Sequence, residues 1–140
     1  MAQAEGKNIP FVGLDHVDVD VLEAFPAVRE CELRPLSTSG KDGFLAVHYT
    51  TSEFSAVCPF SGLPDVAKVS ISYVPDDLIV ELKSLKYYLM SYRQVGVYQE
   101  HVTRLIASHL ADLLQVPVTV ETDYNVRGGI DTMCSITVRP

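Results

Sequence analysis

The segment from Val66 to Tyr73 alternates between apolar and polar side chains, and this period of two limits the possible folds more than any other feature of the chain. The two kinds of side chain lie on opposite sides, with Val69, Ile71 and Tyr73 against Lys68, Ser70 and Ser72. A strand with this pattern buries one face of a sheet and leaves the other face in solvent. The segment therefore predicts a sheet that is covered on one face only.

Three other segments have the composition of strands. They run from Gly43 to Thr50, from Val116 to Tyr124 and from Ile130 to Val138. The last two are separated by the stretch from Asn125 to Gly129, whose composition predicts a hairpin turn. We also expect a short extended piece, from Leu78 to Glu81, to add to the sheet.

Two amphipathic helices are expected between the inner strands. Ser84 is the expected N-cap of the first helix, which ends before Gly96. The second runs from about Tyr98 to Gln115. Its expected inner face carries the apolar residues Val102, Leu105, Ile106, Leu110, Leu113 and Leu114. Its expected outer face carries Thr103, Arg104, Ser108 and Asp112.

The order strand, strand, helix, helix, strand, strand predicts an α+β fold, with a four-stranded antiparallel sheet and two helices on one face. A length of 140 residues, of which 47% are hydrophobic, fits one domain. We expect this domain to span residues 21–140, after a loosely ordered segment at 1–20. A small open sheet leaves unpaired edges, so we expect the chain to self-associate into a homo-oligomer.

Charge and cysteine content exclude several classes of protein. Eleven Lys and Arg against 18 Asp and Glu give a net charge of -7, which argues against a nucleic acid as the partner. Three cysteines without a CxxC motif argue against a disulfide framework and a zinc knuckle, and we interpret Cys31 and Cys134 as small core residues. With no visible secretory signal and no membrane-spanning run, we expect a cytoplasmic protein without a bound metal.

The stretch from Phe54 to Asp65 is predicted to be a loop, and it contains the clearest candidates for catalytic residues. Cys58 precedes a proline, and Gly62 and Pro64 fix a turn before Asp65. A thiolate can attack an electrophilic carbon, and a nearby carboxyl group can supply a proton to the anion that develops. A buried core cysteine beside an ordinary loop aspartate would explain the same residues and is the commoner arrangement.

Four motifs in the chain resemble those of one enzyme family, the 7-cyano-7-deazaguanine reductases of queuosine biosynthesis. Cys-Pro-x-x-Gly-x-Pro-Asp, which begins at Cys58, resembles their active-site loop. The run from Glu81 to Tyr88 resembles their cofactor motif. The run Ser-Tyr-Arg that ends at Arg93, with Glu100 after it, resembles their helical segment, and Arg127-Gly-Gly resembles their hairpin. The resemblance covers roughly residues 14–138.

The resemblance implies the tunnelling fold, whose subunits form rings with sites between them, and two hydride transfers from NADPH that reduce a nitrile to an amine in the biosynthesis of a modified tRNA base. It implies that Cys58 forms a covalent thioimide and that Asp65 donates the proton. The substrate-binding residues that it implies are Val80, Glu81, Leu82, Gln99 and Glu100. The cofactor-binding residues that it implies are Leu82, Lys83, Lys86, Arg127 and Gly128.

One position departs from the family, because Gln99 stands where its members usually have His before the base-binding Glu. Gln can form hydrogen bonds but cannot titrate. His101 is rotated by about 200° from that position on a helix, two residues further on, and is a poor substitute. Simpler interpretations also exist for several motif residues: solvated surface charge for Lys83, Lys86 and Arg127, and a helix-dipole contact for Glu100.

Three other functions share the same motifs or the same fold. The first is an amidinotransferase that forms the thioimide on a nitrile-modified tRNA and lets ammonia attack it. The second is a non-catalytic binder of deazapurines. The third, a pterin-type hydrolase, would need a zinc ligand set that the sequence does not offer.

Overall fold

The computed structural model describes residues 17–26 and 45–140. In chain order its elements are β1 (Ala24–Pro26), β2 (Val47–Val57), β3 (Pro64–Tyr73), β4 (Leu78–Val80), α1 (Leu82–Ser91), the 3-10 helix η1 (Tyr92–Gln94), α2 (Gln99–Leu114), β5 (Val118–Arg127) and β6 (Ile130–Val138). The predictions for residues 1–16, for Cys31 and for the start of the first predicted strand lie outside the described residues.

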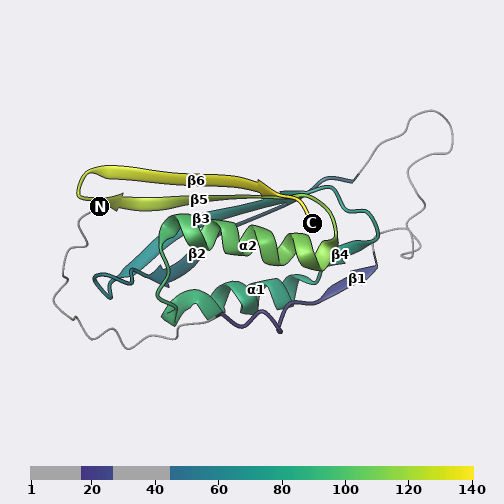
Figure 1. Cartoon of the computed structure of the whole chain (residues 1–140), viewed down its shortest axis with the longest axis horizontal. Coiled ribbons are helices and arrows are strands. Elements are labelled where there is room, and N and C mark those ends of the chain that lie inside the picture. Colours follow the sequence, from purple (N-terminus) through teal and green to yellow (C-terminus); the bar gives the residue numbers. More distant parts are fainter. Residues whose placement is uncertain (1–16, 27–44) are drawn as a thin grey trace.

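The main sheet has four antiparallel strands in the order β2-β3-β5-β6. Both helices cover the same face of this sheet (Figure 1). The predicted α+β fold with an antiparallel sheet and two helices is therefore confirmed. The alternation predicted for β3 is confirmed too, since every second residue from Asp65 to Tyr73 is buried.

The turn between β2 and β3 is much shorter than the predicted loop. The prediction that Phe54 to Asp65 form one loop is wrong, because β2 continues to Val57 and β3 already begins at Pro64, directly opposite Val57. The register shifts between Thr51 and Phe54. This irregularity interrupts the alternation of apolar and polar residues in the middle of β2, so periodicity alone does not predict the second half of the strand.

The short strand β4 does not add to the main sheet, contrary to the prediction. It pairs with β1 in a separate two-stranded sheet, with Ala24 opposite Val80. The N–H of Glu81 continues this contact and donates to the Glu23 carbonyl at 2.8 Å. A segment near the N-terminus thus supplies hydrogen-bond partners to the backbone just before α1. No local sequence pattern predicts a pairing between segments so far apart in the chain.

The N-cap of α1 is Glu81 and not Ser84 as predicted. The two carboxylate oxygens of Glu81 accept hydrogen bonds from the backbone N–H groups of Lys83 at 2.9 Å and Ser84 at 2.7 Å. Two of the N–H groups that a helix start leaves unpaired are therefore satisfied by one side chain. Ser84 is buried inside the first turn and accepts a hydrogen bond from the N–H of Glu23 at 3.0 Å.

The inner face of α2 is partly different from the prediction. Thr103, expected outside, is only 2% exposed, whereas Leu105, expected inside, is 37% exposed. The hydroxyl groups of Thr103 and Thr122 of β5 form a hydrogen bond of 2.5 Å. Because the sheet supplies this polar partner, Thr103 can face inward, and Leu105 is then rotated about 200° away from it.

The buried hydroxyl pair makes a prediction about stability. Thr103→Val should lower the free energy of unfolding by roughly 1–3 kcal/mol, since it leaves the Thr122 hydroxyl buried without that partner. The double variant Thr103→Val, Thr122→Val should recover much of this loss, because both polar partners are then removed together. Urea denaturation of the two variants measures the difference, and equal losses in both would contradict the expectation.

Candidate active site

Cys58 opens the tight turn that joins β2 to β3. Its N–H donates to the Leu63 carbonyl at 2.9 Å, and its own carbonyl accepts from the N–H of Gly62 at 2.8 Å. Gly62 has a φ of 69°, a left-handed conformation that a residue without a Cβ adopts at little cost. The backbone of the turn is thereby closed on itself, and the thiol is left half-buried at its start.

The turn also sets the acidity of the thiol. Burial raises the pKa of Cys58, but hydrogen bonds from the Ser61 side chain and from the backbone N–H groups of Ser61 and Phe60 act in the opposite direction. These donors outweigh burial and the small opposing effect of the Asp65 carboxylate, so the pKa of Cys58 lies below its usual value. A larger thiolate fraction at neutral pH makes the sulfur a better nucleophile.

Asp65 lies at the start of β3 on the face that the helices cover, and it is only 5% exposed. A guanidinium nitrogen of Arg127 donates to its Oδ1 atom. Arg127 ends β5, directly before Gly128 and Gly129, which have φ values of 59° and 77°. The predicted hairpin arginine thus reaches back over the sheet to the predicted proton donor, and an ion pair of this kind compensates for the burial of a charge.

The start of α2 is tied to the same turn by the backbone. The N–H of Val57 donates to the Val95 carbonyl at 2.9 Å, and the N–H of Val97 donates to the Val57 carbonyl at 3.0 Å. The chain then enters α2 at Gln99, which is half-buried, and Glu100, which is exposed in the first turn. In Figure 1 the β2–β3 turn, the start of α2 and the β5–β6 turn lie at one end of the molecule. We call this end, with Cys58, Asp65, Gln99, Glu100, Arg127 and Gly128, the Cys58 end.

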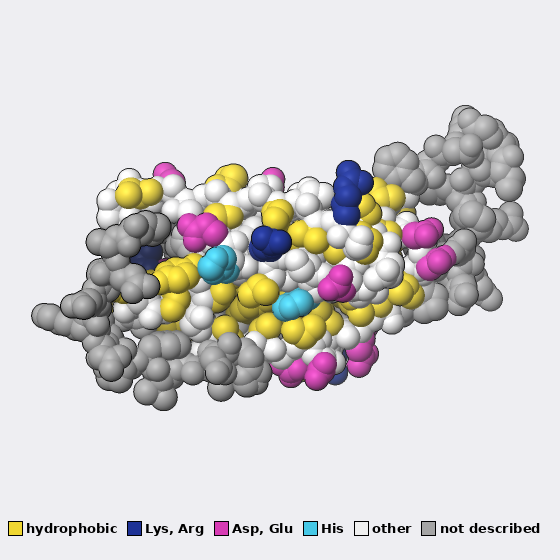
Figure 2. All heavy atoms as spheres, viewed as in Figure 1, with side chains coloured by type: hydrophobic (Ala, Val, Ile, Leu, Met, Phe, Trp, Pro, Cys, Tyr) yellow, Lys and Arg dark blue, Asp and Glu magenta, His cyan; other side chains and the backbone are white. Residues whose placement is uncertain are grey.

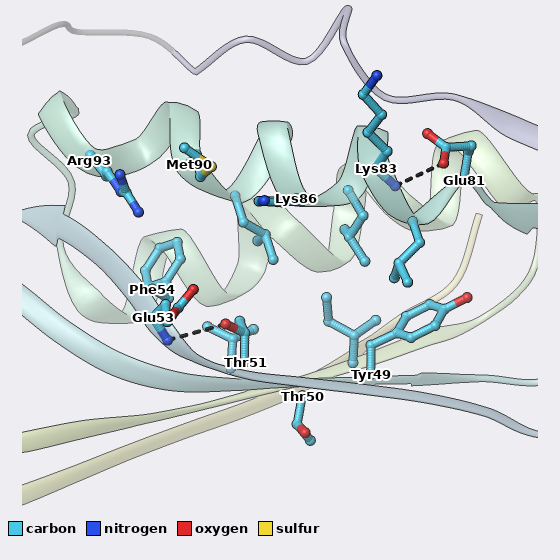
Figure 3. Close-up of a pocket in the computed structure, with 15 residues that line it drawn as sticks. Tyr49, Thr50, Thr51, Glu53, Phe54, Glu81, Lys83, Lys86, Met90 and Arg93 are labelled. Atoms are coloured by element: carbon cyan, nitrogen blue, oxygen red, sulfur yellow. Dashed lines mark hydrogen bonds between the residues drawn. The ribbon is translucent and has the colours of Figure 1, made fainter.

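A second group of predicted residues lines a groove of about 810 Å³ between α1 and β2, which we call the α1 groove. Glu81, Leu82, Lys83 and Lys86 all belong to it. Figure 3 shows that Phe54 and Tyr49 lie on the β2 side and Lys86, Met90 and Arg93 on the helical side, while the ammonium group of Lys83 points away from the sheet. The lining combines apolar side chains with the cationic groups of Lys86 and Arg93 and the carboxylates of Glu53 and Glu81.

The two groups of predicted site residues are separated within one chain. The start of α1, with Glu81 and Lys83, lies at the end of the molecule opposite to the Cys58 end (Figure 1). Val80, predicted to bind substrate, is 1% exposed in the core and does not line the groove. Sequence patterns assign no role to Arg93 of the α1 groove or to Tyr124 near Asp65. Arg93 belongs to one of the motifs, whereas Tyr124 is only the last residue of a predicted strand.

Among the described residues, no group of three or more His, Cys, Asp and Glu side chains is arranged to hold a metal ion. No helix among them is long and apolar enough to cross a membrane. Outside the two groups, the Nδ1 atom of His109 forms a hydrogen bond of 2.7 Å with the Tyr88 hydroxyl.

A cysteine with a lowered pKa, next to a buried carboxyl group on a small antiparallel α+β domain, defines a protein equipped for covalent thiol chemistry. The chain matches the family described as QueF-like protein over residues 64–139. It is 47% identical to the "NADPH-dependent 7-cyano-7-deazaguanine reductase" of Thermotoga maritima, over 94% of this chain and 88% of the relative. It is 46% identical to the protein with the same name from Caldicellulosiruptor bescii, over 90% of this chain and 88% of the relative. The chain belongs to this family of reductases.

A solved structure supports the fold independently. The crystal structure of the archaeosine synthase QueF-Like in the apo form aligns with a TM-score of 0.62, over 66% of this chain and 91% of that chain. Sequence identity in this alignment is 20%, so the likeness concerns the fold alone.

The hydrogen bonds of Ser61 predict how the thiol titrates. Ser61→Ala removes the side-chain donor that favours the thiolate, so the pKa of Cys58 should rise. The rate of alkylation by iodoacetamide, measured as a function of pH, should then have its midpoint at a higher pH than in the unchanged protein. Ser52→Ala, on an exposed position of β2, serves as the control, and a midpoint that does not move in Ser61→Ala would contradict the assignment.

Proposed function

We propose that this chain reduces the nitrile of 7-cyano-7-deazaguanine to the primary amine of 7-aminomethyl-7-deazaguanine, with NADPH as the reductant, in the biosynthesis of queuosine for tRNA. The observation that carries the proposal is the Cys58 thiol, whose pKa is lowered by three hydrogen-bond donors and which lies in a turn leading to Asp65. The names of relatives that are 46–47% identical support the same reaction.

The thiol chemistry begins with the addition of the Cys58 thiolate to the nitrile carbon. A C–S bond forms, and the C≡N triple bond becomes a double bond. The Asp65 carboxylate takes the proton that the Cys58 thiol gives up and passes it to the nitrogen, which gives a neutral thioimide. The addition converts an unreactive C≡N group into a more polarised C=N group, which is easier to reduce. The C–S bond later breaks and the thiolate returns, so the cysteine is unchanged after each cycle.

The α1 groove suits a phosphate-bearing cofactor. Lys86 and Arg93 bring cationic groups to its lining, and Lys83 carries a third cationic group beside it at the start of α1, pointing away from the sheet. Apolar side chains from α1 and β2 make up most of the interior, with the carboxylates of Glu53 and Glu81 among them. Charge-assisted hydrogen bonds from cationic groups are the usual means of holding phosphates. NADPH, when bound, supplies hydride, and two such transfers with two protons balance the reduction of a nitrile to an amine.

Carboxylate groups would recognise the base. The ring N–H and amino group of a deazaguanine are donors, and Glu100 offers acceptors at the exposed start of α2. Glu81 can contribute as well, since each of its oxygens retains a lone pair beyond the capping hydrogen bonds. Gln99 would take the place of the usual histidine and support the substrate without exchanging a proton.

A complete site requires a second copy of the chain in this proposal. The Cys58 end and the start of α1 lie at opposite ends of one chain, and β2 and β6 are edges of the main sheet. Apolar side chains such as Leu82, Tyr87 and Leu105 also reach the surface along the helices (Figure 2). A ring of tunnelling-fold domains, each spanning residues 21–140, would bring the two groups together in the cytoplasm.

An amidinotransferase that acts on nitrile-modified tRNA is the second candidate, because the archaeosine synthase shares the fold. The same thioimide would then be attacked by ammonia and not by hydride. Product mass separates the two: a primary amine in the presence of NADPH supports the reductase, and an amidine in the presence of ammonia supports the transferase. An adduct that yields neither product would point to a binder of deazapurines.

The nucleophile is tested by intact mass. Incubation with 7-cyano-7-deazaguanine without NADPH should add the mass of the base to the protein, and Cys58→Ala should abolish this gain. Cys134→Ala is the matched control and should retain it. Asp65→Asn should still bind the base but form the adduct more slowly, since the nitrogen lacks its proton donor. An adduct that persists in Cys58→Ala would remove the proposed nucleophile.

The role of the α1 groove in cofactor binding is tested by removing two of its lysine charges. The double variant Lys83→Ala, Lys86→Ala should weaken NADPH binding by roughly tenfold or more, since hydrogen bonds to charged groups contribute about 1.5–3 kcal/mol each. Lys68→Ala removes a cation from the opposite face of the sheet and should leave the affinity unchanged. Fluorescence titration with NADPH measures all three proteins, and equal affinities would mean that the two lysines are only surface charge.

A further inference from the structure

Tyr124 carries an unusual hydroxyl group. The residue is 4% exposed, and its oxygen is a buried side-chain atom without a hydrogen-bond partner among the described residues, the one such atom there. Buried polar atoms in folded proteins are almost always paired, so each exception requires an explanation. A ligand that pairs with the hydroxyl when it binds is one such explanation.

The sheet register places this hydroxyl beside the Cys58 end. Tyr124 of β5 lies opposite Ala67 of β3, and Asp65 is two residues from Ala67 on the same covered face. Asp65 and Tyr124 are therefore diagonal neighbours across two strands, a separation that long side chains can bridge. The aromatic ring and the carboxyl group that we assign to proton donation thus share one patch of the sheet.

The helix above places Glu100 over the same patch. Thr122, two residues before Tyr124 on the same face of β5, bonds to Thr103 of α2 at 2.5 Å. Glu100 lies one helical turn before Thr103, toward the start of α2, on the side where β5 continues to Tyr124. The nearby Thr122 hydroxyl lowers the pKa of Tyr124, but it bonds to Thr103, and the Tyr124 oxygen has no hydrogen-bond partner among the described residues.

The electrostatics agree with this position. Burial raises the pKa of Tyr124, and the nearby Asp65, Cys134 and Glu100 raise it further. The phenol therefore stays protonated at neutral pH and can act as a donor.

The chemistry of the base indicates which acceptor the Tyr124 hydroxyl would bind. A deazaguanine presents an N–H and an amino group, which carboxylates can accept, but its carbonyl oxygen beside them needs a donor. The carbonyl also neighbours the carbon that bears the nitrile. When the nitrile reaches Cys58 and the donor groups reach Glu100, the carbonyl must lie between the two.

We propose that the Tyr124 hydroxyl donates a hydrogen bond to the carbonyl oxygen of the bound deazaguanine ring and so selects bases that carry this oxygen. This inference rests on the proposed function, because it concerns the same substrate. It adds a substrate-binding residue that lies outside the four sequence motifs.

The test compares two bases that lack a nitrile and so bind without a covalent bond. Tyr124→Phe should weaken the binding of 7-deazaguanine by about three- to tenfold, the effect of one neutral hydrogen bond. It should leave the binding of 2-amino-7-deazapurine, which has no carbonyl oxygen, unchanged. Isothermal titration of the full chain with both bases gives the two ratios. Equal effects on both bases, or no effect on either, would overturn the inference.

A second readout separates ligand binding from structure. Tyr73 is also 4% exposed on the same sheet, but its hydroxyl accepts from the N–H of Val80 at 3.1 Å. Tyr73→Phe should therefore lower the melting temperature and leave the ratio of the two affinities unchanged, whereas Tyr124→Phe, which breaks no such hydrogen bond, should not lower the melting temperature. A lower melting temperature in Tyr124→Phe with an unchanged ratio would assign the hydroxyl to stability and reject the inference.

The proposed function can fail separately. Failure of the unchanged protein to bind 7-deazaguanine would reject the function and the inference together. Normal binding and reduction by the unchanged protein, combined with an unchanged affinity ratio in Tyr124→Phe, would reject the inference alone.

Discussion

Two backbone hydrogen bonds at Val57 hold the candidate site together. They join the last residue of β2 to Val95 and Val97, and so fix the segment that leads into α2 beside the turn that begins at Cys58. Backbone contacts of this kind do not depend on which side chains the segment carries. The thiol and the first turn of α2 are therefore positioned by the fold itself, and the side chains at Gln99 and Glu100 can differ without moving the helix.

A row of polar groups lies beneath α2, inside an otherwise apolar core. Asp65, Thr103, Thr122 and Tyr124 are all buried between the helix and the sheet, near the Cys58 end. Asp65 is paired with Arg127 and the two threonines with each other, while Tyr124 has no partner among the described residues. Burying polar groups costs free energy unless they are satisfied, so the two pairs meet this cost within the fold, and Tyr124 is left as the group that we propose a ligand satisfies.

In the function that we propose, the division of the site into two groups would link the reaction to assembly. Cys58 and Asp65 lie at one end of the chain, and the α1 groove lies along α1, with Glu81 at the opposite end. Glu81 illustrates how closely structure and recognition are combined, because the carboxylate expected to bind the base also caps the helix that carries Lys83 and Lys86. Self-association would then complete a catalytic site as well as cover the sheet edges.

The sequence by itself determined the elements whose patterns are local: the alternation of β3, the hairpin of β5 and β6, the amphipathic α2, and the motif residues that identify the family. Tertiary structure decided the rest. The shift in register within β2 broke its alternation, β4 paired with β1 instead of the main sheet, and Thr103 turned inward because Thr122 lay opposite. Each of these outcomes depends on contacts between residues far apart in the chain, which periodicity cannot encode. For the same reason Tyr124 looked like an ordinary strand residue until the sheet placed it beside Asp65.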